Sequence, residues 1–182
     1  MTRLKKRKFY DSTYVPRENR KAAILACITL WSLIFFFVIT KFILGTVDIV
    51  GHSMLPTLKD QERYVINRIA YNFQPPDRND IVAVVSISDH ELIVKRVVGL
   101  PHDRIRFDGD RLWVNDRLFK EAYASSPFSG SYAEQTWDLR EKEYFVLGDN
   151  MNHSEDSRSF GPVPEEYIVG RIVLRWKLFD GF

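Results

Sequence analysis

The sequence predicts a mainly β protein, in which an antiparallel, barrel-like domain is tethered by one N-terminal transmembrane helix. Two observations lead to this prediction. A long run without charged residues lies near the N-terminus, and short segments rich in β-branched residues follow it at intervals. The expected division is a basic segment at 1–21, a membrane anchor at 22–44, and a β-rich domain facing the outside at 45–182.

Charge is concentrated at the start of the chain. Residues 1–21 carry eight Lys or Arg against two acidic residues, whereas the remaining 18 basic and 22 acidic residues sum to −4. The formal net charge of +2 does not indicate a nucleic-acid binder. The basic cluster at residues 3–8 either contacts anionic lipid headgroups or merely sets the orientation of the chain.

The uncharged run extends from Ala22 to Thr40. At about 1.5 Å per residue it nearly crosses a hydrocarbon core of roughly 30 Å, and continuation to Leu44 with Lys41 snorkelling completes the span. A cleaved export signal has a shorter apolar part, about 7–15 residues, followed by a small-x-small site. An uncleaved single-pass anchor is therefore expected, with the N-terminus in the cytoplasm and the later residues outside the cell membrane.

The later residues alternate between apolar and polar in short runs typical of strands. Two hairpins are expected, one with a turn just before residue 91 and one around residues 108–110. Residues 121–139 have weak periodicity and many Ser, Pro and Gly, which indicates an irregular, mobile excursion. The expected strands lie in 63–71, 80–87, 91–100, the two halves of 103–119, 143–149 and 167–176.

A serine and a lysine are the candidates for chemistry. Ser53 lies a few residues beyond the anchor, and Lys95 interrupts the apolar run "LIVKRVVGL". If the lysine faces inward, desolvation lowers its pKa from about 10.4 towards roughly 7–8, and the neutral amine can take a proton from a serine hydroxyl. A surface lysine is the alternative. His52 is a poor candidate base if its segment is extended, because neighbouring side chains then point to opposite faces.

Three segments, "GHSMLPTL", "VKRVVGLPHDRI" and "GDNMNHSEDSRSFGPV", together resemble the motif set of the type I signal peptidases. These are membrane-anchored Ser/Lys endopeptidases that remove signal peptides from exported preproteins, and the resemblance covers about residues 22–178. It implies that Ser53 is the nucleophile, Lys95 the general base, and Ser154 the residue that orients the lysine. It implies no metal and no organic cofactor.

The resemblance also implies supporting and substrate-binding residues. The supporting charged residues are Arg96, Asp149, Asp156 and Arg158. The pockets for small side chains of the substrate are expected at Val47, Ile49, Met54, Leu58, Ile93 and Val94, with ordinary core packing as the alternative. A short tether from residue 44 to residue 53 would hold the nucleophile near the membrane, and an extended substrate would pair with residues 48–50 and 91–94.

Two positions depart from the motif set. Gly51 stands where some members have a serine that joins the oxyanion hole, and His102 stands in a turn where the family usually has glycine. Histidine costs about 1 kcal/mol at positive φ, so the turn is expected to differ in detail.

Other functions remain open at this level. A membrane-anchored peptide-binding β module without catalysis is one, and a processing protease specialised for pilus or conjugation proteins is another. A self-cleaving repressor would need a DNA-binding head, which the sequence does not contain. The expected partners are signal peptides and the lipid bilayer, with no nucleic acid; the sequence makes no prediction of oligomeric state.

Overall fold

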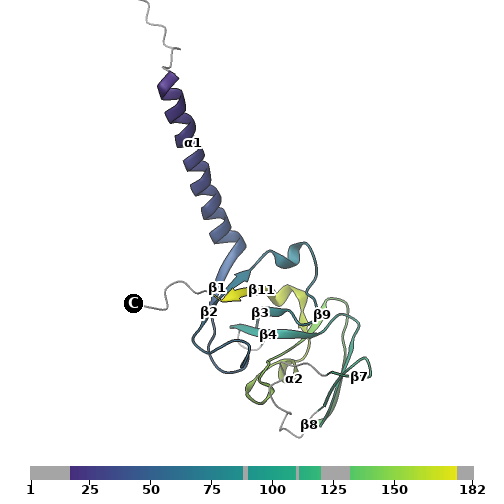
Figure 1. Cartoon of the computed structure of the whole chain (residues 1–182). Helices are drawn as coiled ribbons and strands as arrows, with labels where there is room; N and C mark the ends of the chain where they lie inside the picture. The colour runs from purple at the N-terminus through teal and green to yellow at the C-terminus, as the bar shows by residue number, and fades with distance from the viewer. Residues whose placement is uncertain (1–16, 88–89, 110, 120–131, 176–182) are drawn as a thin grey trace, which may run out of the picture. The chain divides into compact units, whose positions relative to one another are not determined.

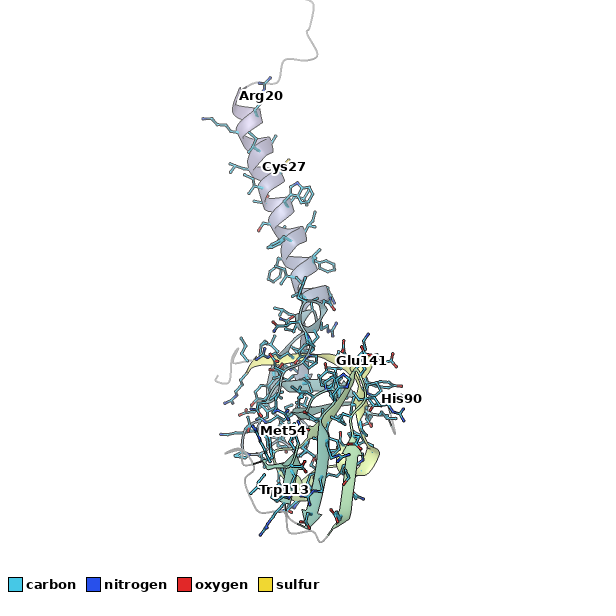
Figure 2. The ribbon with its side chains drawn as sticks, turned by 90° about the vertical axis from the view of Figure 1, so that its right-hand side faces the viewer. Arg20, Cys27, Met54, His90, Trp113 and Glu141 are labelled. Atoms are coloured by element: carbon cyan, nitrogen blue, oxygen red, sulfur yellow. The ribbon has the colours of Figure 1, made fainter. Side chains whose placement is uncertain are left out.

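The structure, a computed structural model, describes residues 17–87, 90–109, 111–119 and 132–175 (Figure 1). The chain divides into two units, Met1–Thr40 and Lys41–Phe182, which are described separately. In the first unit the described residues form helix α1 (Arg17–Val38). Figure 2 shows side chains projecting from all sides of this helix, and its large apolar side chains are exposed. The stretch Arg20–Val38 has a mean hydropathy of 2.2 and is long enough to cross a membrane.

The helix ends earlier than the sequence predicts. After Val38 the chain makes a π-helical turn (η1, Ile39–Ile43), and Leu44 is the first residue of strand β1. The predicted anchor end at residue 44 therefore falls inside the sheet, where Leu44 pairs with Asn67. Pairing with β2 satisfies the backbone N–H and C=O groups of β1. The apolar pattern of the sequence does not reveal this partner strand.

The second unit is built from two antiparallel sheets, which confirms the predicted fold class (Figure 1). The larger sheet has the order β1-β2-β11-β3-β4-β9-β10 and the smaller has β7-β6-β5-β8. The strands of the larger sheet are β1 (Leu44–Asp48), β2 (Arg63–Asn67), β3 (Ile81–Val85), β4 (Leu92–Gly99), β9 (Glu143–Leu147), β10 (Val163–Pro164) and β11 (Ile168–Arg175). Those of the smaller sheet are β5 (Arg104–Gly109), β6 (Arg111–Val114), β7 (Arg117–Leu118) and β8 (Tyr132–Asp138).

Four short helical segments connect the strands. They are η2 (Ala70–Asn72), η3 (Met151–His153), α2 (Ser157–Phe160) and η4 (Glu165–Tyr167). The predicted strand at 63–71 is shorter than expected, because β2 stops at Asn67. The Asn67 side chain accepts a hydrogen bond from the Ile69 N–H at 3.1 Å and turns the chain towards η2.

The larger sheet is strongly curled. Val47 of β1 and Val94 of β4 belong to the same buried cluster, although three strands lie between their strands in the sheet order. In a flat sheet with strands about 4.8 Å apart these side chains would be almost 20 Å from each other. Curling encloses the first core and gives the sheet the barrel-like form that the sequence predicts.

Both predicted hairpins are confirmed. Strands β3 and β4 pair with Val82 opposite Lys95, and β5 and β6 pair with Asp108 opposite Arg111. The prediction of an irregular excursion over 121–139 is wrong for its last part, because Tyr132–Asp138 forms β8. Residues 120–131 lie outside the described residues.

Strand β8 is not predicted because an alternating apolar pattern is weak in its sequence. Trp137 packs against the second core, and its ring contacts those of Phe107 and Phe145 at centroid distances of 6.1 and 4.9 Å. These aromatic rings join the two sheets in one buried cluster. Pairing with β5 and this one aromatic contact hold β8, whereas an alternating apolar pattern is weak in its sequence.

Phe145→Ala should lower the free energy of unfolding by about 3–5 kcal/mol, because the phenyl ring is fully buried (0% exposed) and its removal leaves a cavity between the sheets. Urea denaturation of the detergent-solubilised full chain, followed by tryptophan fluorescence, measures this change. Leu118→Ala, at an exposed position of β7, is the control and should cost far less. Equal losses for the two variants would contradict the assignment of this cluster as a core.

Candidate active site

Ser53 lies in a tight turn whose two ends are fixed. The N–H of Gly51, a residue with φ of 97°, donates to Asp60 Oδ1 at 2.8 Å. On the far side, the Leu58 N–H donates to the Met54 carbonyl at 2.9 Å, and both of these side chains are buried. The predicted tether between residues 44 and 53 is thus largely a sheet strand followed by an anchored turn.

His52 does not lie in an extended segment, contrary to the condition under which its side chain would point away from Ser53. The Leu55 N–H donates to the His52 carbonyl at 3.2 Å, which closes a turn. Alternation of side chains along a strand therefore does not apply to His52 and Ser53. The preference for Lys95 as the base depends on the surroundings of the lysine itself.

Lys95 is buried, with 4% of its surface exposed, as expected for an inward-facing residue of β4. Burial lowers the pKa of its amine, because the charged form loses hydration. The carboxylate of Asp156 acts in the opposite direction and the guanidinium of Arg158 lowers the pKa further. The amine is thus biased towards its neutral form, which is the form that can accept a proton.

Gly148 is a point of close packing between two of the predicted residues. A Cβ atom at Gly148 would lie 2.6 Å from the Ser53 carbonyl oxygen and 2.6 Å from Ser154 Cβ, and it would collide with Ser154 Oγ. The turn of Ser53 and the loop of Ser154 therefore approach each other around a position that has no side chain. Lys95 lies on the neighbouring strand, one residue before Arg96, which pairs with Leu147 at the start of the β4–β9 ladder.

Ser154 Oγ is buried and has no hydrogen-bond partner among the described residues. Leaving a buried hydroxyl without a hydrogen-bond partner lowers the stability of the fold by about 1–3 kcal/mol. Such groups are therefore rare and each calls for an explanation, a catalytic role being one. Its place beside Gly148 agrees with the predicted orienting role towards Lys95, which stays a prediction.

A buried ion pair connects the turn of Ser53 to the sheet. Arg96 donates two hydrogen bonds to Asp149, from Nε at 2.8 Å and from Nη2 at 2.7 Å. Thr57 Oγ1 donates to the same carboxylate at 2.5 Å, and Arg96 Nη1 donates to the Asn79 carbonyl at 2.9 Å. Both carboxylate oxygens of Asp149 accept hydrogen bonds, which offsets the free-energy cost of burying the charges. The Arg96–Asp149 pair therefore fixes the end of the turn.

A second buried ion pair shapes the loop that carries Ser154. Arg158 donates to Asp156 from Nε and from Nη2, each at 2.8 Å, and also to the Met151 carbonyl at 2.7 Å. Asp156 accepts in addition from the Gly148 N–H at 3.1 Å and caps the short helix α2. The four predicted supporting residues therefore form two separate ion pairs.

The predicted substrate-binding residues lie in the cores of the unit. Ile93 packs against the cluster that contains Val82 and Val146. The other five share one buried cluster and pack there as core residues: Val47, Ile49, Met54, Leu58 and Val94. Contact of these side chains with a substrate stays a prediction. No group of three or more His, Cys, Asp or Glu among the described residues is placed to hold a metal ion.

Comparison with known proteins identifies the family of the chain. Residues 21–177 match the family model described as signal peptidase, peptidase S26. The chain belongs to this family. It is 33% identical to signal peptidase IB of Staphylococcus aureus strain Mu50 over 167 residues, which cover 83% of this chain and 87% of that protein. Signal peptidase I of Leptolyngbya laminosa is 35% identical over 134 residues, with coverage of 69% and 65%.

A crystal structure of a signal peptidase I from Enterococcus faecalis V583 is 30% identical, with a TM-score of 0.49, and the match covers 55% of this chain and 98% of that one. Membership of the family makes this chain a serine endopeptidase of the signal peptidase I type. The apolar helix α1 and the family together identify a membrane-anchored peptidase.

One residue of the peptidase received no role from the sequence although it lies in the third motif. The backbone N–H of Asn150 donates to the Ser53 carbonyl at 2.9 Å, and its side-chain amide donates to the His52 carbonyl at 3.1 Å. Its position directly after Gly148 and Asp149 in the third motif is the sequence signal for this contact. Gly148 lies in the same motif, and a sequence pattern does not reveal its importance, which is the absence of a side chain where the turn of Ser53 and the loop of Ser154 meet.

The two departures from the family pattern are also located. His102 has φ of 70°, so it occupies the conformation that glycine adopts more easily, and the turn still closes, with the Asp103 N–H donating to the Leu100 carbonyl at 3.0 Å. Gly51 has positive φ as well, and its N–H is already bonded to Asp60.

Gly148→Ala should lower kcat/KM by about 10²-fold or more, because the added methyl group would collide with Ser154 and with the Ser53 carbonyl and displace both residues. Hydrolysis of a fluorogenic signal-peptide substrate measures the effect. Gly99→Ala is the control. Its methyl would also be crowded, 2.7 Å from Leu139 Cδ1, but in the second core. Similar destabilisation with most of the activity kept is expected for the control, and equal loss of activity in both variants would contradict the assignment.

Proposed function

We propose that the chain carries out the reaction of its family, removal of signal peptides from preproteins, with Ser53 as nucleophile and Lys95 as general base. The observation that carries this proposal is the buried amine of Lys95, whose pKa is lowered. Lys95 directly precedes Arg96, which pairs with Leu147, and the next residue, Gly148, is where Ser53 and Ser154 approach each other. A neutral amine in a desolvated position is the form that can activate a hydroxyl near neutral pH.

Acylation begins when neutral Lys95 Nζ accepts the proton of Ser53 Oγ. The oxygen attacks the carbonyl carbon that follows a small substrate side chain, and the C–O bond forms as the carbonyl electrons move to its oxygen. The lysine ammonium then gives its proton to the departing nitrogen as the C–N bond breaks. The leaving amine is the new N-terminus of the mature protein, and the signal peptide remains as an ester on Ser53.

Deacylation repeats these steps with water. Lys95 takes one proton from a water molecule, the hydroxide oxygen bonds to the ester carbon, and the proton returns to Ser53 Oγ as the ester bond breaks. Ser154, beside Gly148, would hold the lysine in position in both halves of the reaction.

Stabilisation of the oxyanion depends on the turn. The backbone N–H of Ser53 is the proposed donor. Gly51 adds no hydroxyl, and its own N–H is bonded to Asp60 at 2.8 Å. The two hydrogen bonds from Asn150 to the His52 and Ser53 carbonyls fix the peptide planes that aim this donor.

An extended substrate would bind by strand addition. Strand β1 lies at an edge of the larger sheet, and Val50 just beyond it is exposed. The β4–β9 ladder begins at Arg96, so the first half of β4 has β3 as its neighbour in the described sheet, with its other edge open. Residues 48–50 and 91–94 are therefore the proposed partners of the substrate backbone, and the predicted apolar residues behind them would favour small side chains.

The proposed orientation places the N-terminus in the cytoplasm and residues 45–182 outside the cell membrane. Eight basic residues precede the apolar run, and basic flanks remain on the cytoplasmic side. The bilayer then holds both the anchor and the apolar segment of the signal peptide, so the cleavage site emerges on the side of the nucleophile.

Ser53→Ala and Lys95→Met should each lower kcat/KM by on the order of 10⁴–10⁶, because the base and nucleophile act as one unit. Mass spectrometry of a preprotein before and after incubation with each variant measures both the activity and the cut site. The double variant should be no worse than either single variant. Cleavage that persists in Lys95→Met would reject the dyad, and a wild-type chain that binds the preprotein without cutting it would favour a peptide-binding module.

The activity should rise with pH through the lowered pKa of Lys95 and then level off, because the neutral amine is the active form. Stability should rise in the same direction. Between the folded pKa and the ordinary lysine pKa of about 10.4, the unfolded chain binds more protons, so the free energy of unfolding increases with pH. Lys95→Met should lose that part of the slope. The initial rate and the urea midpoint, measured across pH, test both statements; a pH-independent rate would contradict the first.

A further inference from the structure

The backbone just after β1 has one paired side and one open side. The Ile49 N–H donates to the Glu62 carbonyl at 2.9 Å, and the Ile49 carbonyl accepts from the Gln61 N–H at 2.8 Å. Backbone groups alternate between the two sides of an extended strand, so those of Asp48 and Val50 point to the opposite side. Strand β1 is the first strand of the larger sheet and pairs with β2 alone among the described strands, which leaves that side open.

A carboxylate fixes the peptide between Val50 and Gly51. The Gly51 N–H donates to Asp60 Oδ1 at 2.8 Å. This peptide bond is trans, so the Val50 carbonyl points away from the Gly51 N–H and therefore away from Asp60, towards the open side of β1. Val50 is 91% exposed, which leaves this edge accessible to a ligand.

Gly51 gives the peptide a freedom that the carboxylate removes. Its φ is 97°, and no atom of a neighbouring segment lies within 4 Å of a Cβ built there, so packing does not restrain it. Asp60 is itself held in a closed turn, because the Glu62 N–H donates to the Lys59 carbonyl at 3.4 Å. Asp60 forms no ion pair with any residue that the structure describes. Its carboxylate is therefore available to the Gly51 N–H, in a charge-assisted bond roughly twice as strong as a neutral one.

We infer that Asp60 is a positioning residue for the substrate backbone. By fixing the Val50–Gly51 peptide, it aims the Val50 carbonyl at an N–H of the signal peptide, which lies extended along the open side of β1. Gly51 is two residues before Ser53, so the same hydrogen bond sets the register of the substrate relative to the nucleophile. Asp60 itself touches neither the substrate nor the reacting atoms. The inference rests on the proposed cleavage of signal peptides and adds a residue that acts on substrate binding.

Asp60→Ala tests this role in the detergent-solubilised full chain. Loss of one aimed hydrogen bond should lower kcat/KM for a fluorogenic signal-peptide substrate by about 10-fold, mainly through KM. Asp60→Asn should stay within about 3-fold of wild type, because its amide oxygen still accepts from the Gly51 N–H. Glu143→Ala is the matched control and should leave KM unchanged, since Glu143 also accepts from a backbone N–H at 2.8 Å, that of Arg140, but in another turn. An unchanged KM in Asp60→Ala would overturn the inference.

Backbone esters in the substrate separate the aiming of the carbonyl from the stability of the turn. In a series of peptides, one amide at a time on the signal-peptide side of the cut is replaced by an ester, which removes its N–H. One ester should lower kcat/KM about 10-fold in wild type but less than about 2-fold in Asp60→Ala, where the Val50 carbonyl is no longer aimed. Esters that remove hydrogen bonds to β4 should have equal effects in both chains. Asp60→Leu, which keeps the side-chain volume without an acceptor, replaces the alanine variant if urea denaturation shows that variant to be unfolded.

The ester series also separates this inference from the proposed function. Equal effects of every ester in wild type and Asp60→Ala would overturn the inference and leave Asp60 as a residue that only stabilises the turn. If the wild-type chain cuts none of the peptides, or Lys95→Met cuts them as fast, the proposed function fails and the inference fails with it. Cleavage that requires Ser53 and Lys95, with no ester coupled to Asp60, would reject the inference alone.

Discussion

The site depends on one steric constraint, the absence of a side chain at position 148. The turn of Ser53 and the loop of Ser154 approach so closely here that a Cβ atom would meet both of them at 2.6 Å. Close packing of this kind fixes positions more firmly than hydrogen bonds alone, because neighbouring atoms cannot move apart without leaving a void. The chemistry proposed for Ser53 and Lys95 needs that fixed approach, since a proton moves between atoms that must be in contact.

The charged residues around this point have two separate effects. The Arg96–Asp149 pair, with Thr57, holds the end of the turn. The Asp156–Arg158 pair lies close enough to Lys95 to affect its pKa from both sides, as the carboxylate raises it and the guanidinium lowers it. Because the two opposing effects partly cancel, desolvation remains the dominant cause of the lowered pKa. A lone carboxylate in that place would favour the charged amine, which is inactive as a base.

The sheet connects this chemistry to the membrane. Strand β1 begins directly after the π-helical turn that follows α1, and at about 3.3 Å per residue it carries the chain roughly 13 Å from Leu44 to Asp48. The hydrogen bonds of Ile49 with Glu62 and Gln61 extend this fixed path to the turn of Ser53. The distance of Ser53 from the sheet end near Leu44 is therefore set by a paired strand.

The sequence by itself determined the apolar anchor, the β class and both hairpins, because hydrophobic periodicity and local motifs carry that information. The tertiary structure decided what depends on distant partners. Strand β8 exists because it pairs with β5 and places Trp137 against Phe145, and its own residues alternate too weakly to predict it. The turn at His52 and the roles of Gly148 and Asn150 likewise arise from contacts between segments almost 100 residues apart, which no local pattern encodes.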